Sequence, residues 1–95
     1  MSNKKYIVRT KNAGVFYGEI ETRSHDEIEM RNVRKLWYWD GAAAIEQLAM
    51  NGTKAPNNCK FTVTVPSMII ADPIQIIEAT EEACKSIEAV KVWQR

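Results

Sequence analysis

The sequence contains few of the residues that build metal centres or disulfide frameworks, and it lacks a long hydrophobic run. Among 95 residues there are two cysteines and one histidine. Cys59 and Cys84 form no CxxC pair, so zinc-ligand spacing is absent and we expect both to be small buried hydrophobic residues. No apolar run approaches the roughly 18–20 residues of a bilayer span, and the N-terminus lacks the apolar core of a signal peptide. We therefore expect a soluble intracellular protein with no metal, no cofactor and no membrane partner.

The sequence also lacks an excess of charge of either sign. Its 13 Lys and Arg against 12 Asp and Glu give a formal net charge of +1. Nucleic-acid-binding proteins usually carry a basic excess, so this balance argues against nucleic acid as the partner. A hydrophobic content of 45% with 26% charged residues is typical of a folded globule. We expect a single domain over residues 1–95, whose small core favours association of chains into a homo-oligomer.

Catalytic signatures are missing as well. The chain contains neither a GxxxxGK[ST] nor a GxGxxG nucleotide-binding pattern. His25 lies in a predicted polar turn, and Asp26 follows it directly, but adjacent residues rarely act as a base and its orienting partner. Neither Cys59 nor Ser24 has a relay partner beside it in the sequence. These absences predict a protein that is not an enzyme.

The first 39 residues show the alternation of hydrophobic and polar residues that is typical of strands. The predicted strands cover residues 5–10, 15–22 and 27–39. Gly18 in the middle of the second strand indicates a bulge or a close approach of another backbone. A bulge near Asn32 is also expected, because without it Val33 would face outward and Arg34 inward. Three such strands with short turns form an antiparallel meander, which curls readily into a half-barrel.

A helix follows the third strand. Asp40 is a favoured N-cap, and the alanine-rich segment at roughly 41–51 has high helix propensity. Ala44, Ile45, Leu48 and Ala49 line one face of this helix, which is therefore amphipathic. Asn51 and Gly52 supply the left-handed stop.

The remaining residues predict more strands and a short helix. Residues 59–65 alternate most clearly and form a strand that Pro66 ends, whereas residues 68–71 are too short for a helix. Residues 74–79 form another strand, Thr80 caps a short helix to about residue 87, and residues 90–93 form an edge strand. The predicted fold class is α+β: a curled antiparallel sheet of five or six strands with one central amphipathic helix and one short C-terminal helix.

The segment RKLWYWDGAAAI at 34–45 holds two of the three tryptophans and one of the three tyrosines. On a strand, Trp37 and Trp39 face one side and Tyr38 the other. One interpretation is that one face packs against the helix and the other covers a subunit interface. The alternative is that an outward aromatic ring stacks on a planar ligand such as a nucleobase, while Arg34 or Lys35 contacts phosphate.

Arginines on the first and third strands offer a second candidate feature. Arg9 and Arg31 would form a cationic patch with Arg34 if these strands are neighbours. Acidic residues on the second and third strands, at 19, 21, 27 and 29, favour cross-strand ion pairs instead. At the Asp40–Gly41 junction, a helix cap is a better interpretation than an anion site, because the Asp40 carboxylate would repel a phosphate. The candidate ligand-binding residues are Arg9, Arg31, Arg34, Trp37, Tyr38 and Trp39.

Most of the chain resembles a family of small proteins encoded mainly by bacteriophages and prophages. The matching segments are YIVRTKNAGVFYGEI (6–20), NVRKLWYWDGAAAIEQLAMNG (32–52), NNCKFTV (57–63) and IQIIEATEEACKSIEAVKVW (74–93). The RKLWYWDGA core carries most of the specificity. The function of this family is uncharacterised, so the resemblance transfers no catalytic or binding residue. It implies a viral context, in which small proteins often block host defences and others are minor virion parts.

Together, these observations predict a non-enzymatic phage-encoded binding protein in the host bacterial cytoplasm. The first expectation is that it antagonises host defence by sequestering a small nucleotide-like ligand or a host protein. The alternative is a phage structural or assembly protein that acts through a homo-oligomeric interface, in which the same aromatic residues are anchors.

Overall fold

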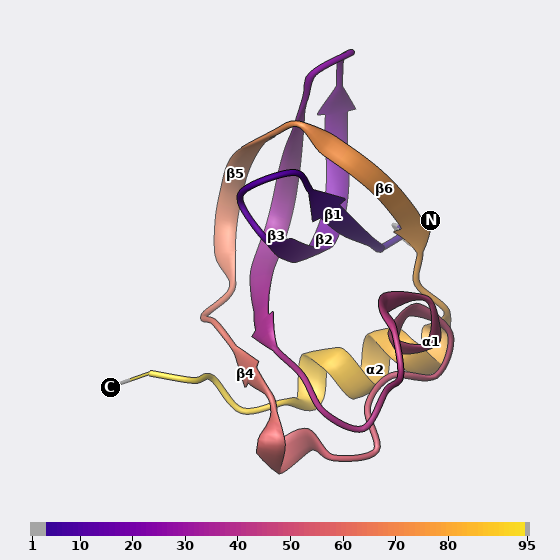
Figure 1. Cartoon of the computed structure of the whole chain (residues 1–95). Helices are drawn as coiled ribbons and strands as arrows, with labels where there is room; N and C mark the ends of the chain where they lie inside the picture. The colour runs from indigo at the N-terminus through magenta and orange to yellow at the C-terminus, as the bar shows by residue number, and fades with distance from the viewer. Residues whose placement is uncertain (1–3, 95) are drawn as a thin grey trace.

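The computed structural model describes residues 4–94, which form six strands, two α-helices and one 3-10 turn (Figure 1). The strands are β1 (Tyr6–Thr10), β2 (Val15–Arg23), β3 (Glu27–Tyr38), β4 (Lys60–Phe61), β5 (Val65–Ala71) and β6 (Pro73–Glu78). The helices are α1 (Ile45–Asn51) and α2 (Glu81–Ala89), and the 3-10 turn η1 covers Pro56–Asn58. The predicted α+β class with a curled antiparallel sheet is confirmed.

The sheet is antiparallel throughout and has the order β4-β3-β2-β1-β6, with β5 also paired to β3. β5 and β6 therefore belong to opposite edges, yet one residue, Asp72, joins them. Asp72 has a φ of 54°, and its N–H donates to the carbonyl of Asp26 at the start of β3. Figure 1 shows the result, an arch that runs from β5 on the left over to β6 on the right. The sheet curls until its two edges nearly meet, without closing.

Two hydrophobic clusters lie on the two faces of this sheet. The first is made only of strand residues and is enclosed by the curl: Val8, Phe16, Ile28, Met30, Val33 and Ile70. The second lies between the sheet and the two helices, and it includes Ile7, Tyr17, Leu36, Leu48, Phe61 and Ile87. Neighbours along a strand alternate between the clusters, as Ile7 and Val8 do. Most of β1 and the first half of β2 are therefore buried on both faces.

The bulge expected near Asn32 is confirmed. Tyr17 pairs with Arg34 and Glu19 pairs with Arg31, so Asn32 and Val33 together lie opposite the single residue Gly18. Asn32 has a φ of 50°. A Cβ atom on Gly18 would lie 2.9 Å from the carbonyl oxygen of Arg31, so the predicted close backbone approach is confirmed too.

The bulge turns Val33 inward as predicted, but Arg34 does not face solvent. Val33 is fully buried in the cluster enclosed by the curl, and Arg34 is only 4% exposed on the opposite face. The expectation of an outward Arg34 is wrong because that face of β3 is covered by the end of α2, whose carbonyls bind the Arg34 side chain.

The predicted start of the first helix is wrong. α1 begins at Ile45, its N-cap is Ala44, and no side chain caps it at that position. Asp40 lies in a loop, where Gly41 has a φ of 81° and its carbonyl accepts a hydrogen bond from Lys54 N–H. This link to a distant segment holds residues 40–44 out of the helix. The stop at Gly52, which has a φ of 75°, is confirmed.

The helix face is narrower than predicted, and it consists of three buried residues: Ile45, Leu48 and Ala49. Ala44 is exposed because it precedes the helix. The side chain of Gln47 instead satisfies the backbone at this end, since its Oε1 accepts a hydrogen bond from Ala43 N–H. The backbone at the start of the helix is thus bound by the side chain of Gln47, from the first turn, rather than by a capping aspartate.

The strand predicted over residues 59–65 is wrong in extent. β4 contains two residues, and Val63 is 57% exposed despite its place in the alternating pattern. Thr62 interrupts the strand because its N–H donates to the Lys35 carbonyl and its Oγ1 accepts from the Lys35 N–H. Pro66 does not end a strand. It lies within β5, which pairs only with β3 among the described residues and can therefore accommodate proline.

The C-terminal elements agree more closely with the prediction. β6 and the cap of α2 are confirmed, since Thr80 Oγ1 accepts a hydrogen bond from Ala83 N–H. Residues 90–93 do not form an edge strand; Val92 makes a single parallel bridge to Phe61. Among the described residues, neither helix is long and apolar enough to cross a membrane.

Candidate functional site

Three exposed aromatic side chains gather around one lysine at the C-terminal end of β3. We call Trp37, Tyr38, Trp93 and Lys60 the aromatic cluster. The rings of Trp37 and Trp93 stack with their centroids 5.0 Å apart and their planes inclined by 17°. Trp37, Tyr38 and Trp93 remain 53%, 49% and 37% exposed. So large an accessible aromatic area is the usual mark of a contact surface on a small domain.

The fold positions this cluster through β4. Leu36 pairs with Phe61 and Tyr38 pairs with Lys60, with a register shift between the two pairs. Leu36 fills the core under the helices, while Trp37 and Tyr38 both reach the surface. Trp93 is brought alongside because its N–H donates to the carbonyl of Phe61. Two segments that are distant in the sequence therefore meet on the same short strand.

Lys60 occupies the centre of the cluster. Its Nζ atom lies 5.3 Å from the ring centroid of Trp37, 5.6 Å from that of Trp93 and 6.0 Å from that of Tyr38. A cation over an exposed aromatic face is worth about 0.5–1 kcal/mol, so Lys60 holds the rings in place and supplies a positive charge among them.

A groove of about 440 Å³ opens beside the aromatic cluster. Its lining residues are Tyr38, Asp40, Asn57, Asn58, Cys59, Lys60 and Trp93. The Asn58 amide donates a hydrogen bond of 3.3 Å to the Asp40 carboxylate, which links the two polar sides of the groove. The groove thus combines aromatic walls, one cation, two amides and one carboxylate, which can bind a planar polar ligand.

The structure brings together only part of the predicted ligand-binding set. Trp37 and Tyr38 belong to the aromatic cluster, whereas Trp39 is half-buried and packs against the core under the helices. Arg31 is exposed on β3 and pairs with Glu21 of β2, a cross-strand ion pair of the kind predicted, and also with Glu29 of its own strand. Arg9 lies on β1, exposed, between its partners on β2 and β6.

Arg34 is engaged in the interior. Its guanidinium donates hydrogen bonds to the backbone carbonyls of Phe61, Thr62, Ile87 and Val90. Burial lowers the pKa of Arg34 from its ordinary value, while the nearby charge of Glu88 works in the opposite direction. With four of its N–H groups bound to backbone, Arg34 ties β3 to the end of α2 and has little capacity left for a ligand phosphate.

Trp93 and Lys60 were missed by reasoning from the sequence. Lys60 looks like one polar residue of an alternating strand, and Trp93 is an isolated tryptophan near the chain end. Their contribution depends on the pairing of residues 60–61 with both β3 and the segment after α2. No pattern in the sequence around residues 60–61 or around Trp93 predicts that pairing.

A second group of ionisable side chains lies beneath α2. Glu88 Oε2 accepts hydrogen bonds from Lys5 Nζ and from the Tyr17 hydroxyl. Burial raises the pKa of Tyr17, and hydrogen bonding with Cys84 and Glu88 adds to this effect. For Glu88, burial opposes ionisation, but the hydrogen bonds from Lys5 and Tyr17 outweigh it and the pKa is lowered. These contacts hold α2 against the sheet.

Across the part of the chain that the structure describes, no three His, Cys, Asp or Glu side chains gather as metal ligands. Both cysteines are free thiols. Cys59 is buried in the core as predicted, while Cys84 is half-buried and packs against it.

The search of curated proteins and the search of solved structures each returned no match. One family model matches, and it covers residues 3–87, most of the chain. That match includes β1 to β6 and most of α2, but it stops before Trp93. The chain belongs to the family described as a domain of unknown function, DUF6948.

Proposed function

We propose that this chain is a non-enzymatic binding protein that holds a small nucleotide-like ligand in the groove beside the aromatic cluster. The observation that carries the proposal is the gathering of three exposed aromatic rings around Lys60 at the edge of that groove. Planar rings and a cation match the two parts of a nucleotide, its base and its phosphate.

In the proposed complex, the base stacks on Tyr38 or Trp93 and the phosphate lies near Lys60. Stacking of a base on an aromatic side chain contributes about 1–3 kcal/mol. Asn57 and Asn58 have amides that can donate to, and accept from, the edge of a base. The Asp40 carboxylate disfavours phosphate on its side of the groove, which directs the phosphate towards Lys60. Trp37 supports the site from behind by stacking on Trp93.

The biological context of the proposal comes from the phage and prophage proteins that the chain resembles. In the cytoplasm of a bacterial host, a small protein that sequesters a signalling nucleotide would antagonise a defence that depends on it. This role requires tight binding without chemistry, which agrees with a site of aromatic, amide and ammonium groups.

The test is calorimetric titration of the purified chain with a panel of mono-, di- and cyclic nucleotides. A binding nucleotide should also raise the melting temperature, since a ligand at about 100 times its Kd adds roughly 2.7 kcal/mol to stability. Trp93→Ala and Tyr38→Ala should each abolish or strongly weaken binding, and Lys60→Gln should weaken it and reduce its salt dependence. Lys85→Gln is the matched control, because Lys85 is exposed on α2 and its salt bridge is with Glu81 on the same helix.

Circular dichroism of each variant establishes that the sheet is intact before binding is compared. If no nucleotide in the panel binds the folded wild-type chain, the proposal is wrong. It is also wrong if binding persists unchanged in Trp93→Ala and Tyr38→Ala.

A second candidate function is that of a phage structural or assembly protein with a homo-oligomeric interface. It is favoured by the Trp37 side chain, which is 53% exposed and does not line the groove. Exposed apolar area of this kind is characteristic of association surfaces. Light scattering separates the two functions: an oligomer that Trp37→Ala converts to monomers, in a chain without nucleotide affinity, supports the structural function.

A further inference from the structure

A second pocket lies at the open end of the curled sheet, away from the aromatic cluster. It has a volume of about 300 Å³ and lies between the turn from β2 to β3 and the start of β6. We call it the mouth pocket. Its lining residues are Arg23, Ser24, His25, Ile28, Pro73, Ile74, Gln75 and Ile76. None of them belongs to the groove of the proposed nucleotide site.

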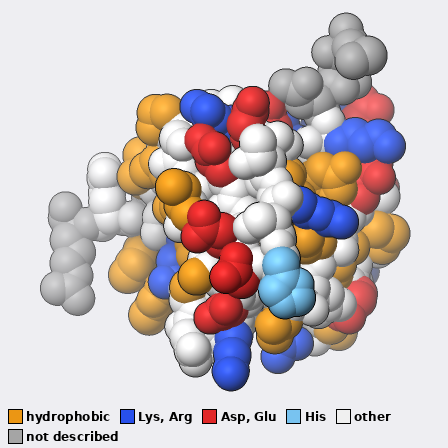
Figure 2. All heavy atoms as spheres, turned by 90° about the horizontal axis from the view of Figure 1, so that it is seen from above, with side chains coloured by type: hydrophobic (Ala, Val, Ile, Leu, Met, Phe, Trp, Pro, Cys, Tyr) orange, Lys and Arg blue, Asp and Glu red, His pale blue; other side chains and the backbone are white. Residues whose placement is uncertain are grey.

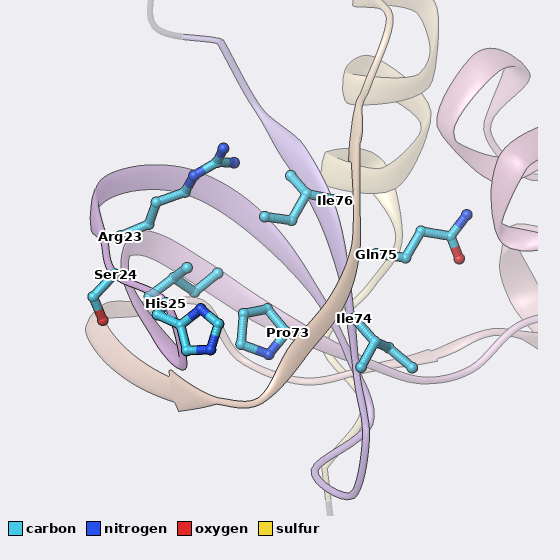
Figure 3. A pocket seen from close by; sticks show the side chains of 8 residues that line it. Arg23, Ser24, His25, Pro73, Ile74, Gln75 and Ile76 are labelled. Carbon is cyan, nitrogen blue, oxygen red and sulfur yellow. The ribbon is translucent and has the colours of Figure 1, made fainter.

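The mouth pocket has an apolar side and a basic side. Figure 3 shows Arg23 at the end of β2 and His25 in the following turn facing Pro73 and Ile76 of β6, with the Arg23 side chain reaching towards Ile76. Ile28 is 1% exposed and belongs to the cluster enclosed by the curl, and Ile76 packs against that cluster. The apolar side is therefore continuous with the core and firmly held.

The basic side has unused hydrogen-bond donors. Within residues 4–94, the Arg23 and His25 side chains take part in no ion pair, hydrogen bond or ring contact. Gln75, in contrast, is already bound through its amide to Glu46 of α1. No acidic residue lines the pocket.

The surface around the histidine is divided by charge. Figure 2 shows acidic side chains gathered on one side of the histidine and, on the other side, a basic side chain over hydrophobic ones. The free donors and the apolar wall thus lie together, apart from the acidic surface.

We propose that the mouth pocket binds a small carboxylate with an apolar tail, an aliphatic or aromatic monocarboxylate. The tail lies against Ile28, Pro73 and Ile76, and the carboxylate accepts hydrogen bonds from Arg23 and His25. A concave apolar site with a few convergent polar groups is the usual form of a small-ligand site. The planar guanidinium can bind a carboxylate through two parallel hydrogen bonds, which favours a carboxylate over a neutral head group.

The test uses hexanoate and its neutral analogue hexanol as probes of the full chain, followed by ¹⁵N–¹H NMR. Hexanoate should shift the amide signals of residues 23–25 and 74–76 in a saturable way, while hexanol should bind at least about tenfold more weakly, because it lacks the charge-assisted hydrogen bonds. Signals of residues 57–60 should stay unchanged, which separates this pocket from the nucleotide groove.

Two variants complete the experiment. Arg23→Gln should weaken hexanoate binding about tenfold and leave that of hexanol unchanged. Arg31→Gln is the matched control, since Arg31 is an exposed arginine on β3 that does not line the pocket. The proposal is overturned if hexanoate causes no saturable shifts, if hexanol binds equally well, or if Arg23→Gln and Arg31→Gln behave alike. None of these results bears on nucleotide binding at the aromatic cluster.

Discussion

Arg34 in β3 donates a hydrogen bond of 2.9 Å from Nη1 to the backbone carbonyl of Ile87 in α2. The same nitrogen donates to the carbonyl of Val90 at 3.0 Å, so one guanidinium satisfies two carbonyls at the C-terminal end of the helix. These carbonyls lie at the negative end of the helix dipole, and that of Ile87 also accepts a hydrogen bond from Val90 N–H at 3.3 Å. A buried arginine therefore serves as the C-terminal cap of α2 and joins it to the sheet.

Arg34→Lys should destabilise the protein strongly. A lysine ammonium cannot donate to four carbonyls from one plane as the guanidinium does, so some of these hydrogen bonds would be lost. We expect a loss of about 3 kcal/mol in the free energy of unfolding. Urea denaturation followed by tryptophan fluorescence measures this loss. Arg31→Lys is the control, because its ion pairs are exposed and should change stability by less than about 1 kcal/mol. Equal stability of the two variants would contradict the role of Arg34 as a helix cap.

The ionic contact beneath α2 should make stability depend on pH in the acid range. The pKa of Glu88 is lowered in the folded protein, so the unfolded chain binds a proton more readily. The contribution of Glu88 to the free energy of unfolding is therefore complete above the unfolded pKa of about 4.3. It is lost as the pH falls through the lower folded pKa.

Glu88→Gln should consequently reduce the fall in melting temperature below about pH 4.3. Melting curves between pH 7 and pH 2 provide the measurement. Glu81→Gln serves as the comparison, because Glu81 lies on the same helix with its side chain largely in solvent. A wild-type acid dependence in Glu88→Gln would show that this carboxylate contributes nothing to it.

Gly18→Ala should destabilise the meander. The added Cβ atom would lie 2.9 Å from the Arg31 carbonyl oxygen and 3.0 Å from Val33 Cα, both in the backbone of β3. Because the backbone cannot move aside as a side chain would, we expect a cost of about 1–3 kcal/mol. Thermal or urea unfolding measures it, and Ala71→Val, which adds volume at an exposed site on β5, should have a much smaller effect.

The stack of Trp37 and Trp93 should have a spectroscopic signature. Two indoles with centroids 5.0 Å apart couple electronically, so the far-ultraviolet circular dichroism should contain an exciton couplet. Trp93→Phe and Trp37→Phe should each remove the couplet and cost about 0.5–1.5 kcal/mol of stability. Trp39→Phe should retain the couplet, since Trp39 packs against the core instead. A couplet that survives Trp93→Phe would argue against the stack.

The first half of the fold could be predicted because its information is local. Alternation marked the three strands of the meander, and the conflict between Val33 and Arg34 located the bulge at Asn32. The errors arose where distant segments form the hydrogen bonds. Asp40 is a favoured residue for a helix cap and precedes an alanine-rich segment. The hydrogen bond from Lys54 N–H to the Gly41 carbonyl nevertheless holds this segment in a loop, and the helix begins at Ile45.

The candidate site was predictable to a similar degree. Trp37 and Tyr38 stood out as a dense aromatic segment, and they are exposed. The sequence cannot show that Arg34 faces the end of α2 rather than a ligand, because that contact depends on where a helix more than 50 residues later docks. For the same reason, Trp93 and Lys60 become visible only once β4 lies between β3 and the segment after α2.

The single-residue junction at Asp72 has a consequence for folding. Ile7 pairs with Ile77, and Ile28 pairs with Ile70, so both pairings join the first third of the sequence to the last third. Pairings between such distant residues form slowly, on the scale of milliseconds to seconds in proteins dominated by them. Since Asp72 is the only residue between β5 and β6, neither strand can separate from its neighbour in the sheet without displacing the other. The curl should therefore open and close as one cooperative unit, which protects both exposed strand edges from separate unfolding.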